Sequence, residues 1–278
     1  MKTCGTWPIG VCSWCIPGDV ADQGAALRRL GVSHVHLAVG PAAEDPGYLP
    51  AVRKQGWTVT STMIGFPQED YSTLERIRAT GGIAPDEHWE TNREIVVKAA
   101  ATTAQLQVPY LSMHAGFIDH ADPAYARTFC DRLRELADVA AGQGIMLLLE
   151  TGQESARDLK TFLTALNHDA VGINFDPANM ILYNKGEPVE ALRMLAPWVR
   201  HVHVKDAVRP ATAGAWGREV PWSTGDVGAK VFLDALRDIG YEGALAIERE
   251  GGASQLADIG NTVTLLSADQ TTGGTDDA

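Results

Sequence analysis

Three acidic residues and one histidine follow short apolar runs in the second half of the chain. They are Glu150 after Ile145–Leu149, Asp176 after Val171–Phe175, His203 at the end of Val199–His203, and Glu248 after Ala244–Ile247. Apolar runs of this length are typical of buried parallel strands. A charged group is costly to bury without a partner, and three carboxylates with one imidazole suit a divalent cation. The four residues therefore predict a metal site in an α/β barrel.

Two of these residues also have ordinary structural explanations. Glu150 could form a buried ion pair with an arginine, and Asp176 could cap a helix or form an Asx turn before Pro177. His201 and His203 share one face of a strand, so one is expected to be the ligand and the other a neighbour. Four such residues at the ends of four successive strands are hard to explain by chance, which favours the metal site.

A repeated unit positions these residues: an amphipathic helix, a glycine and an apolar strand. The glycines of the clearest repeats are Gly31, Gly56, Gly144 and Gly240. Glycine after the last helical turn is the usual left-handed cap. Repeated alternation of helix and strand predicts a parallel sheet with the helices outside it.

Eight strands are expected, at about 8–14, 33–39, 57–64, 109–114, 145–150, 171–176, 199–204 and 244–248. Helices are expected at about 20–30, 46–55, 68–79, 89–106, 122–142, 154–166, 187–197, 227–239 and 254–267. Eight such units predict a single (β/α)8 TIM barrel, the catalytic domain, over residues 1–268. No G-x-G-x-x-G follows the first strand, which argues against a dinucleotide-binding sheet. The small polar residues at 269–278 predict a disordered tail.

Composition narrows the class of protein. The chain has 278 residues, 45% of them hydrophobic, which is enough for one large core. Its net charge of −12, without a basic block, argues against a nucleic-acid or anionic-membrane partner. No signal pattern or membrane-spanning run is evident, so a cytoplasmic location is expected. Cys12 and Cys15 have redox or zinc spacing, but no second pair exists, and reduced thiols are expected.

The motifs of the last five strands resemble those of the xylose isomerase-like TIM barrels of the sugar phosphate isomerase/epimerase superfamily. The motifs are Leu147–Glu150, Asn174–Asn179, His201–Asp206, Gly225–Gly228 and Gly240–Glu248. The resemblance implies one divalent ion, Mn²⁺ first and Mg²⁺ or Co²⁺ as alternatives, held by Glu150, Asp176, His203 and Glu248. It also implies that Glu150 and Glu248 are the acid–base pair on opposite faces of a keto-sugar.

The chain departs from the family pattern at two positions. Asn179 stands where the epimerases usually have a histidine, and His36 stands where the second strand commonly ends in glutamate. The additional zinc ligands and basic surface of the endonuclease members are not evident, so DNA repair is disfavoured. The departures leave simple ketose 3-epimerisation in doubt.

Five further residues are candidates for substrate binding: His114, Asn179, Arg218, Trp14 and Lys205. His114 ends the fourth strand, where the superfamily often has a substrate-contacting histidine, and Trp14 ends the first. Lys205 could neutralise an oxyanion or pair with a carboxylate, and Arg218 offers a fork that suits a carboxylate, phosphate or diol. The long connections 79–90 and 207–226 are expected on the catalytic face.

Three functions remain open. The first is an isomerase or epimerase of a ketose or related keto-polyol that acts through an enediolate. The second is a lyase or dehydratase that acts on a keto-sugar, keto-glycoside or inosose after the same initial proton abstraction. The third, a barrel that only binds sugar, is disfavoured because binding does not need two glutamates. The partner expected is a small carbohydrate, and the resemblance allows a homo-oligomer without deciding it.

Overall fold

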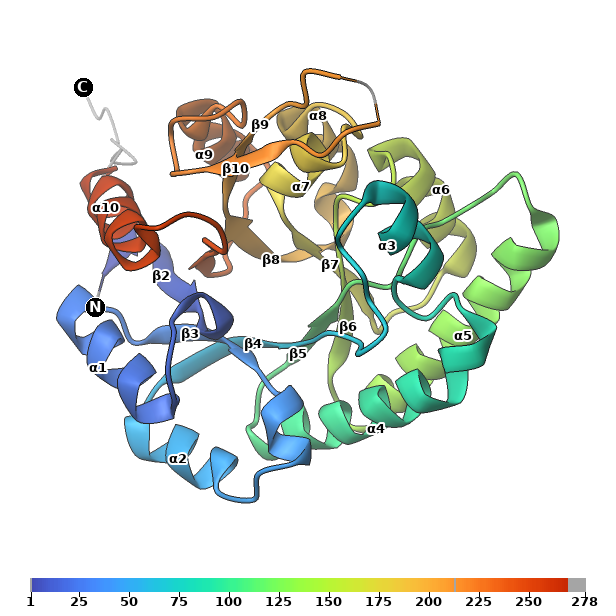
Figure 1. Cartoon of the computed structure of the whole chain (residues 1–278), viewed down its shortest axis with the longest axis horizontal. Coiled ribbons are helices and arrows are strands. Elements are labelled where there is room, and N and C mark those ends of the chain that lie inside the picture. The colour runs from blue at the N-terminus through green and yellow to red at the C-terminus, as the bar shows by residue number, and fades with distance from the viewer. Residues whose placement is uncertain (1, 213, 270–278) are drawn as a thin grey trace, which may run out of the picture.

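Parallel strands close into a barrel in the computed structural model, which describes residues 2–212 and 214–269 (Figure 1). The barrel strands are β2 (Trp7–Cys12), β3 (His34–Ala38), β4 (Thr58–Ile64), β5 (Tyr110–Met113), β6 (Met146–Glu150), β7 (Val171–Phe175), β8 (Val199–Val204) and β11 (Leu245–Ile247). Each pairs in parallel with its neighbour, and β11 pairs with β2 to close the ring. The TIM barrel prediction is confirmed.

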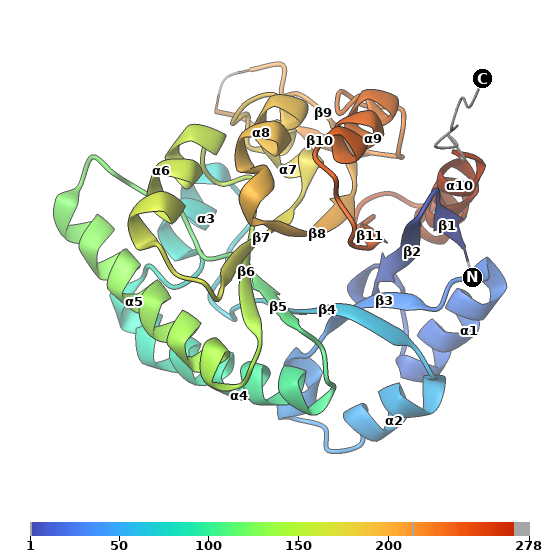
Figure 2. The same cartoon turned by 180° about the vertical axis from the view of Figure 1, so that it is seen from behind.

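Helices cover the outside of the barrel on all sides (Figure 2). The helices of the described residues are α1 (Val20–Leu30), α2 (Tyr48–Gln55), α3 (Leu74–Thr80), α4 (Trp89–Gln105), α5 (Pro123–Gly142), α6 (Ala156–Leu166), α7 (Pro177–Leu182), α8 (Pro188–Leu195), α9 (Ala229–Asp238) and α10 (Gln255–Ala268), and α7 lies at the carboxyl end of the barrel. Short 3-10 turns cover Ser13–Cys15, Gly40–Ala43, Asp86–His88 and Ala196–Trp198. Gly31 ends α1 at φ 69° in the left-handed conformation that the repeat predicts.

The helices pack on the barrel through aliphatic and aromatic side chains. Phe232 of α9 is fully buried and stacks on Phe175 of β7, with ring centroids 6.0 Å apart. Burial of a side chain of this size stabilises the fold by about 1.5–3 kcal/mol. The interior of the barrel is more polar, and its groups pair with one another, as Ser61 and Ser112 do at 2.9 Å between their hydroxyl oxygens. A fixed interior of this kind holds the strand ends in place.

Several elements differ from the sequence-based expectation. The first strand ends at Cys12, so Trp14 lies in a 3-10 turn just past it. The helix expected at 68–79 begins only at Leu74, because the Glu69 and Asp70 carboxylates accept hydrogen bonds from the backbone N–H groups of Phe66 and Ser72. Helix α7, the short strand β1 (Thr3–Cys4) and the hairpin of β9 (Asp206–Val208) with β10 (Arg218–Val220) were not expected.

Both long connections reach the carboxyl ends of the strands. Ile83 in the first donates its backbone N–H to the carbonyl of Ala115, just past β5. The second folds into the β9–β10 hairpin above β8 (Figure 1). No helix within the described residues is long and apolar enough to cross a membrane. Most of the tail expected to be disordered, 270–278, lies outside the described residues.

Candidate active site

The four residues at the strand ends come together at the carboxyl end of the barrel. Glu150 ends β6, Asp176 follows β7, His203 lies in β8 and Glu248 follows β11. One potential ligand atom from each lies within 4.8 Å of all the others, and all four side chains are buried. From His203 Nδ1, the nearest carboxylate oxygens are 3.4 Å away on Glu150, 3.4 Å on Asp176 and 3.3 Å on Glu248.

The donor set fits a divalent metal ion. His203 Nδ1 and Asp176 Oδ2 are both shielded from water and have no hydrogen-bond partner. Leaving such atoms unsatisfied costs about 1–3 kcal/mol each. Oxygen and imidazole ligands about 2.1 Å from a common ion would be roughly 3 Å apart, close to the separations found here. An ion at this point would satisfy both atoms at once.

Asp176 both caps a helix and faces the donor cluster. Its Oδ1 accepts from the backbone N–H groups of Ala178 at 2.8 Å and Asn179 at 3.0 Å, at the first turn of α7. The cap fixes the rotamer and leaves Oδ2 facing His203. Burial raises the pKa of Asp176 to about 6, although Lys205 opposes this, so a cation beside Oδ2 would favour its charged form. The two interpretations of this residue are compatible.

His36 fixes the orientation of the His203 ring. His36 Nε2 is 3.2 Å from the carbonyl oxygen of Thr62, which can only accept, so this nitrogen carries the proton. His36 Nδ1 is then the acceptor for His203 Nε2–H, 2.9 Å away. Burial lowers the pKa of His36 well below its usual range and keeps the ring neutral. His203 Nδ1 is thereby directed toward the carboxylates. Burial opposes its protonation, but neighbouring acidic groups, Glu248 and Glu150 among them, raise the pKa of His203 well above its usual range, so an ion bound at Nδ1 would take the place of a proton there.

The second histidine of the motif is a neighbour of this ring. His201 Nδ1 donates to Asn174 Oδ1 at 2.9 Å, and the Asn174 amide nitrogen lies 3.1 Å from His203 Nε2. His201 Nε2 lies 3.0 Å from the hydroxyl of Thr60, deeper in the barrel. His201 therefore supports His203 from behind and does not face the donor cluster.

Cys12, His36 and His203 form a second group of close ligand atoms. Both ring nitrogens of His36 already have partners, and burial raises the pKa of Cys12 to about 12, so its thiol stays protonated. A protonated thiol is a poor metal ligand. Cys12 and Cys15 are free rather than joined in a disulfide. This group fits an ion less well than the carboxylate cluster.

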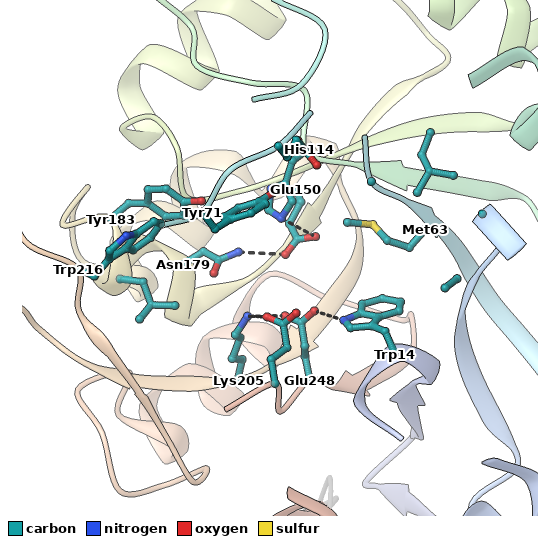
Figure 3. Close-up of a pocket in the computed structure, with 17 residues that line it drawn as sticks. Trp14, Met63, Tyr71, His114, Glu150, Asn179, Tyr183, Lys205, Trp216 and Glu248 are labelled. Atoms are coloured by element: carbon teal, nitrogen blue, oxygen red, sulfur yellow. Dashed lines mark hydrogen bonds and ion pairs between the residues drawn. The ribbon is translucent and has the colours of Figure 1, made fainter. Parts of the chain in front are cut away.

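The two glutamates approach the cavity from opposite sides (Figure 3). Asn179 donates to Glu150 Oε1 at 3.0 Å, and His114 Nε2 lies 3.6 Å from Glu150 Oε2. Although burial opposes it, His114 and His203 lower the pKa of Glu150. Oε2 of Glu150 is shielded from water and has no hydrogen-bond partner. Glu150 therefore has one tethered oxygen and one free oxygen.

Both oxygens of Glu248 are held. Its Oε1 accepts from Trp14 Nε1 at 2.8 Å, and its Oε2 accepts from Lys205 Nζ at 2.8 Å (Figure 3). Burial opposes the charge, but Lys205 and His203 lower the pKa of Glu248 well below its usual range. Lys205 also donates to Glu250 at 2.8 Å. Glu248 is therefore an ionised carboxylate paired with a proton donor.

A cavity of about 680 Å³ opens above these residues. Of the candidates for substrate binding, Trp14, His114, Asn179 and Lys205 line it. Arg218 is not among the residues that line it, and its role in binding stays a prediction. The β9–β10 hairpin places Arg218 at an exposed position and brings Trp216 into the cavity, where it packs on Tyr183.

Sequence reasoning missed other residues that line the cavity, among them Glu69, Tyr71, Tyr183 and Glu250. The Glu69 carboxylate is fixed in place by two hydrogen bonds, because its two oxygens accept from the backbone N–H groups of Phe66 and Gly82, each at 3.0 Å. Burial raises its pKa. The position of Glu69 shortly after an apolar strand could have indicated a site residue. It was overlooked because the polar residues around it were assigned to a helix.

The model of the xylose isomerase-like TIM barrel family matches residues 25–262. The chain belongs to this family. A xylose isomerase domain protein from Planctomyces limnophilus is 32% identical, with a TM-score of 0.86 over 96% of this chain and 97% of that one. No significant match is found among proteins with curated descriptions.

More distant structures share the fold. A 3-keto-D-glucoside 4-epimerase from E. coli is 16% identical, with a TM-score of 0.72 over 94% of this chain and 99% of that chain. A xylose isomerase-like TIM barrel protein from Mycobacterium smegmatis, in complex with magnesium, is 19% identical, with a TM-score of 0.71 over 97% and 100%. Structures of this fold thus include sugar epimerases, and a dehydratase is also among them.

Proposed function

We propose that this protein is a divalent-metal-dependent isomerase or epimerase of a ketose or related keto-sugar. One observation carries the proposal: two buried, ionised glutamates approach one cavity from opposite sides of a cluster of metal-ligand atoms. A barrel that only binds sugar would need neither a buried base nor a second one facing it. Membership of a family whose known structures include sugar epimerases agrees with this function.

A divalent ion held by Glu150, Asp176, His203 and Glu248 would polarise the substrate carbonyl and acidify the neighbouring C–H bond. Glu150 takes that proton through Oε2, its free oxygen, and an enediolate forms. The pair of Glu248 and Lys205 holds a second proton on the opposite side of the substrate and delivers this proton to carbon. Protonation of the same carbon from the opposite face gives the epimer. In the reverse reaction the Glu248–Lys205 pair removes the proton and Glu150 supplies one.

A lyase that starts with the same proton abstraction is the second candidate. Asn179 favours it, because this amide donates to Glu150 where the epimerases usually have a histidine. An amide cannot titrate, so any second proton transfer on this side falls to another group, and His114 is close enough to serve. In a lyase, that proton would go to the departing oxygen.

Mass spectrometry in heavy water tests the proposal. Manganese-loaded protein is incubated with a panel of ketoses, keto-glycosides and inososes. We expect one substrate to gain deuterium with its formula otherwise unchanged, and Glu248→Gln to slow this exchange by roughly 10²–10⁴-fold. The exposed Glu242→Gln is the control and should behave as the parent protein.

Two other outcomes have definite meanings. Loss of water or of an aglycone from the substrate would assign the lyase reaction instead. Near-parental exchange by Glu248→Gln would exclude the two-glutamate mechanism, whichever reaction occurs.

A further inference from the structure

The cavity is larger than a single sugar ring requires. Its volume of about 680 Å³ lies within the range of pockets that hold drug-sized ligands, about 300–1,000 Å³. The groups that would handle a keto-sugar, Glu150, Glu248 and Lys205, are joined by hydrogen bonds or close contacts around His203 and occupy only the floor. The rest of the cavity is therefore available to a second part of the substrate.

Aromatic side chains form one side of this cavity. Tyr71, Tyr183 and Trp216 come from the β4–α3 loop, the end of α7 and the β9–β10 hairpin, and they gather on one side of the cavity (Figure 3). We call these three residues the aromatic wall. Tyr183 and Trp216 pack edge to face with centroids 4.7 Å apart, and Tyr71 lies 6.2 Å from the His114 ring. Segments distant in sequence thus form one aromatic surface.

Tyr71 leaves part of this surface exposed. It is 43% exposed, and it is the one aromatic residue among the large exposed hydrophobic residues of the described chain. An exposed aromatic ring at the mouth of a cavity is a ready contact for a flat or apolar group. The exposed face of Tyr71 therefore marks where such a group would enter.

The charges around the cavity oppose an anionic occupant. Four glutamates line it, Glu69, Glu150, Glu248 and Glu250, against the single ammonium of Lys205, and no arginine of the described residues lines it. Lys205 is already paired with Glu248 and Glu250. A phosphate or carboxylate at the aromatic wall would meet net repulsion that one divalent ion offsets only in part.

From these observations we infer that the aromatic wall is a second subsite, which binds an apolar, preferably aromatic, aglycone attached to the keto-sugar. The inference rests on the proposed function and narrows the substrate class to keto-glycosides with an apolar aglycone. Free monosaccharides and sugar phosphates fit less well, because the first leaves the wall empty and the second brings negative charge to an acidic cavity.

Binding of unreactive glycosides tests the subsite without turnover. Manganese-loaded protein is titrated by calorimetry with phenyl glucoside, methyl glucoside and glucose 6-phosphate. We expect the phenyl glycoside to bind about tenfold or more tightly than the methyl glycoside, and the phosphate to bind weakest. Equal binding of the phenyl and methyl glycosides, or tightest binding of the phosphate, would overturn the inference.

Variants of the wall give a second measurement. Tyr71→Ala and Trp216→Ala should remove most of the preference for phenyl over methyl, measured as the ratio of the two Kd values for each variant. Tyr71→Phe keeps the ring and should keep the preference, and Val231→Ala, on the exposed outer side of α9, is the surface control. If Tyr71→Ala and Trp216→Ala both retain the preference, the wall is not the aglycone site.

Two outcomes distinguish an error in this inference from an error in the proposed function. Selective phenyl glycoside binding without any deuterium exchange would support the subsite and refute the reaction. Equal exchange into methyl and phenyl keto-glycosides, with equal KM, would support the reaction and refute the subsite.

Discussion

His203 carries the most constrained side chain of the site. Its ring is held from behind by the hydrogen bond to His36, and its Nδ1 faces the carboxylates. The sequence allowed the prediction that one histidine of the His201–His203 pair is a ligand, because residues two apart share a strand face. It did not reveal the role of His36, since that contact joins β3 to β8 across the barrel.

Replacing His36 tests this hydrogen-bonded support. In His36→Phe the His203 Nε2–H loses its acceptor, and we expect manganese affinity to fall about 10–100-fold in a calorimetric titration. His36→Gln returns an acceptor oxygen and should recover part of the affinity. His168→Gln, a histidine paired with Asp138 away from the cavity, is the control. Unchanged affinity in a folded His36→Phe protein would show that His203 needs no such support.

At the scale of elements, sequence periodicity predicted the barrel strands but not helix α7 or the β9–β10 hairpin. The eight barrel strands lie within about two residues of the expected ranges, because most are short apolar runs next to helical patterns, and four of them follow a glycine at the end of a helix. Helix α7 was missed because it is short and almost wholly buried, so it shows no amphipathic period. The β9–β10 hairpin was missed because residues 209–217 separate its two strands, so no short turn motif marks it.

The loop that presents Glu69 depends on a glycine. Gly82 has φ +64°, and a Cβ there would lie 2.0 Å from the carbonyl oxygen of Ala115. We expect Gly82→Ala to destabilise the protein by about 1–3 kcal/mol or more in urea unfolding, because the loop must move and its bond to Glu69 is lost.

Gly142→Ala is the matched control for this change. A Cβ at Gly142, the last residue of α5, meets nothing within 4 Å, so the substitution should be neutral or stabilising by up to about 1 kcal/mol. Equal stability of the two variants would contradict the close approach of Gly82 to Ala115.

At the scale of the whole molecule, the barrel brings distant strand ends to one point. This geometry made the four acidic and histidine positions predictable from sequence, since every parallel strand ends on the same face. The cavity walls were less predictable, because they come from loops whose shape depends on one another. Trp216 enters the cavity and Arg218 does not, and nothing in the loop sequence alone distinguishes the two.

Metal titration of the purified protein, first stripped of metal with a chelator, tests the central claim most directly. By calorimetry we expect one Mn²⁺ per chain, a rise in Tm on binding, and loss of both effects in His203→Gln and Asp176→Asn. Cys12→Ser should keep the binding, because its thiol lies outside the carboxylate cluster. If the parent protein bound no ion, or if His203→Gln and Asp176→Asn bound it as the parent does, the four residues would not form the metal centre.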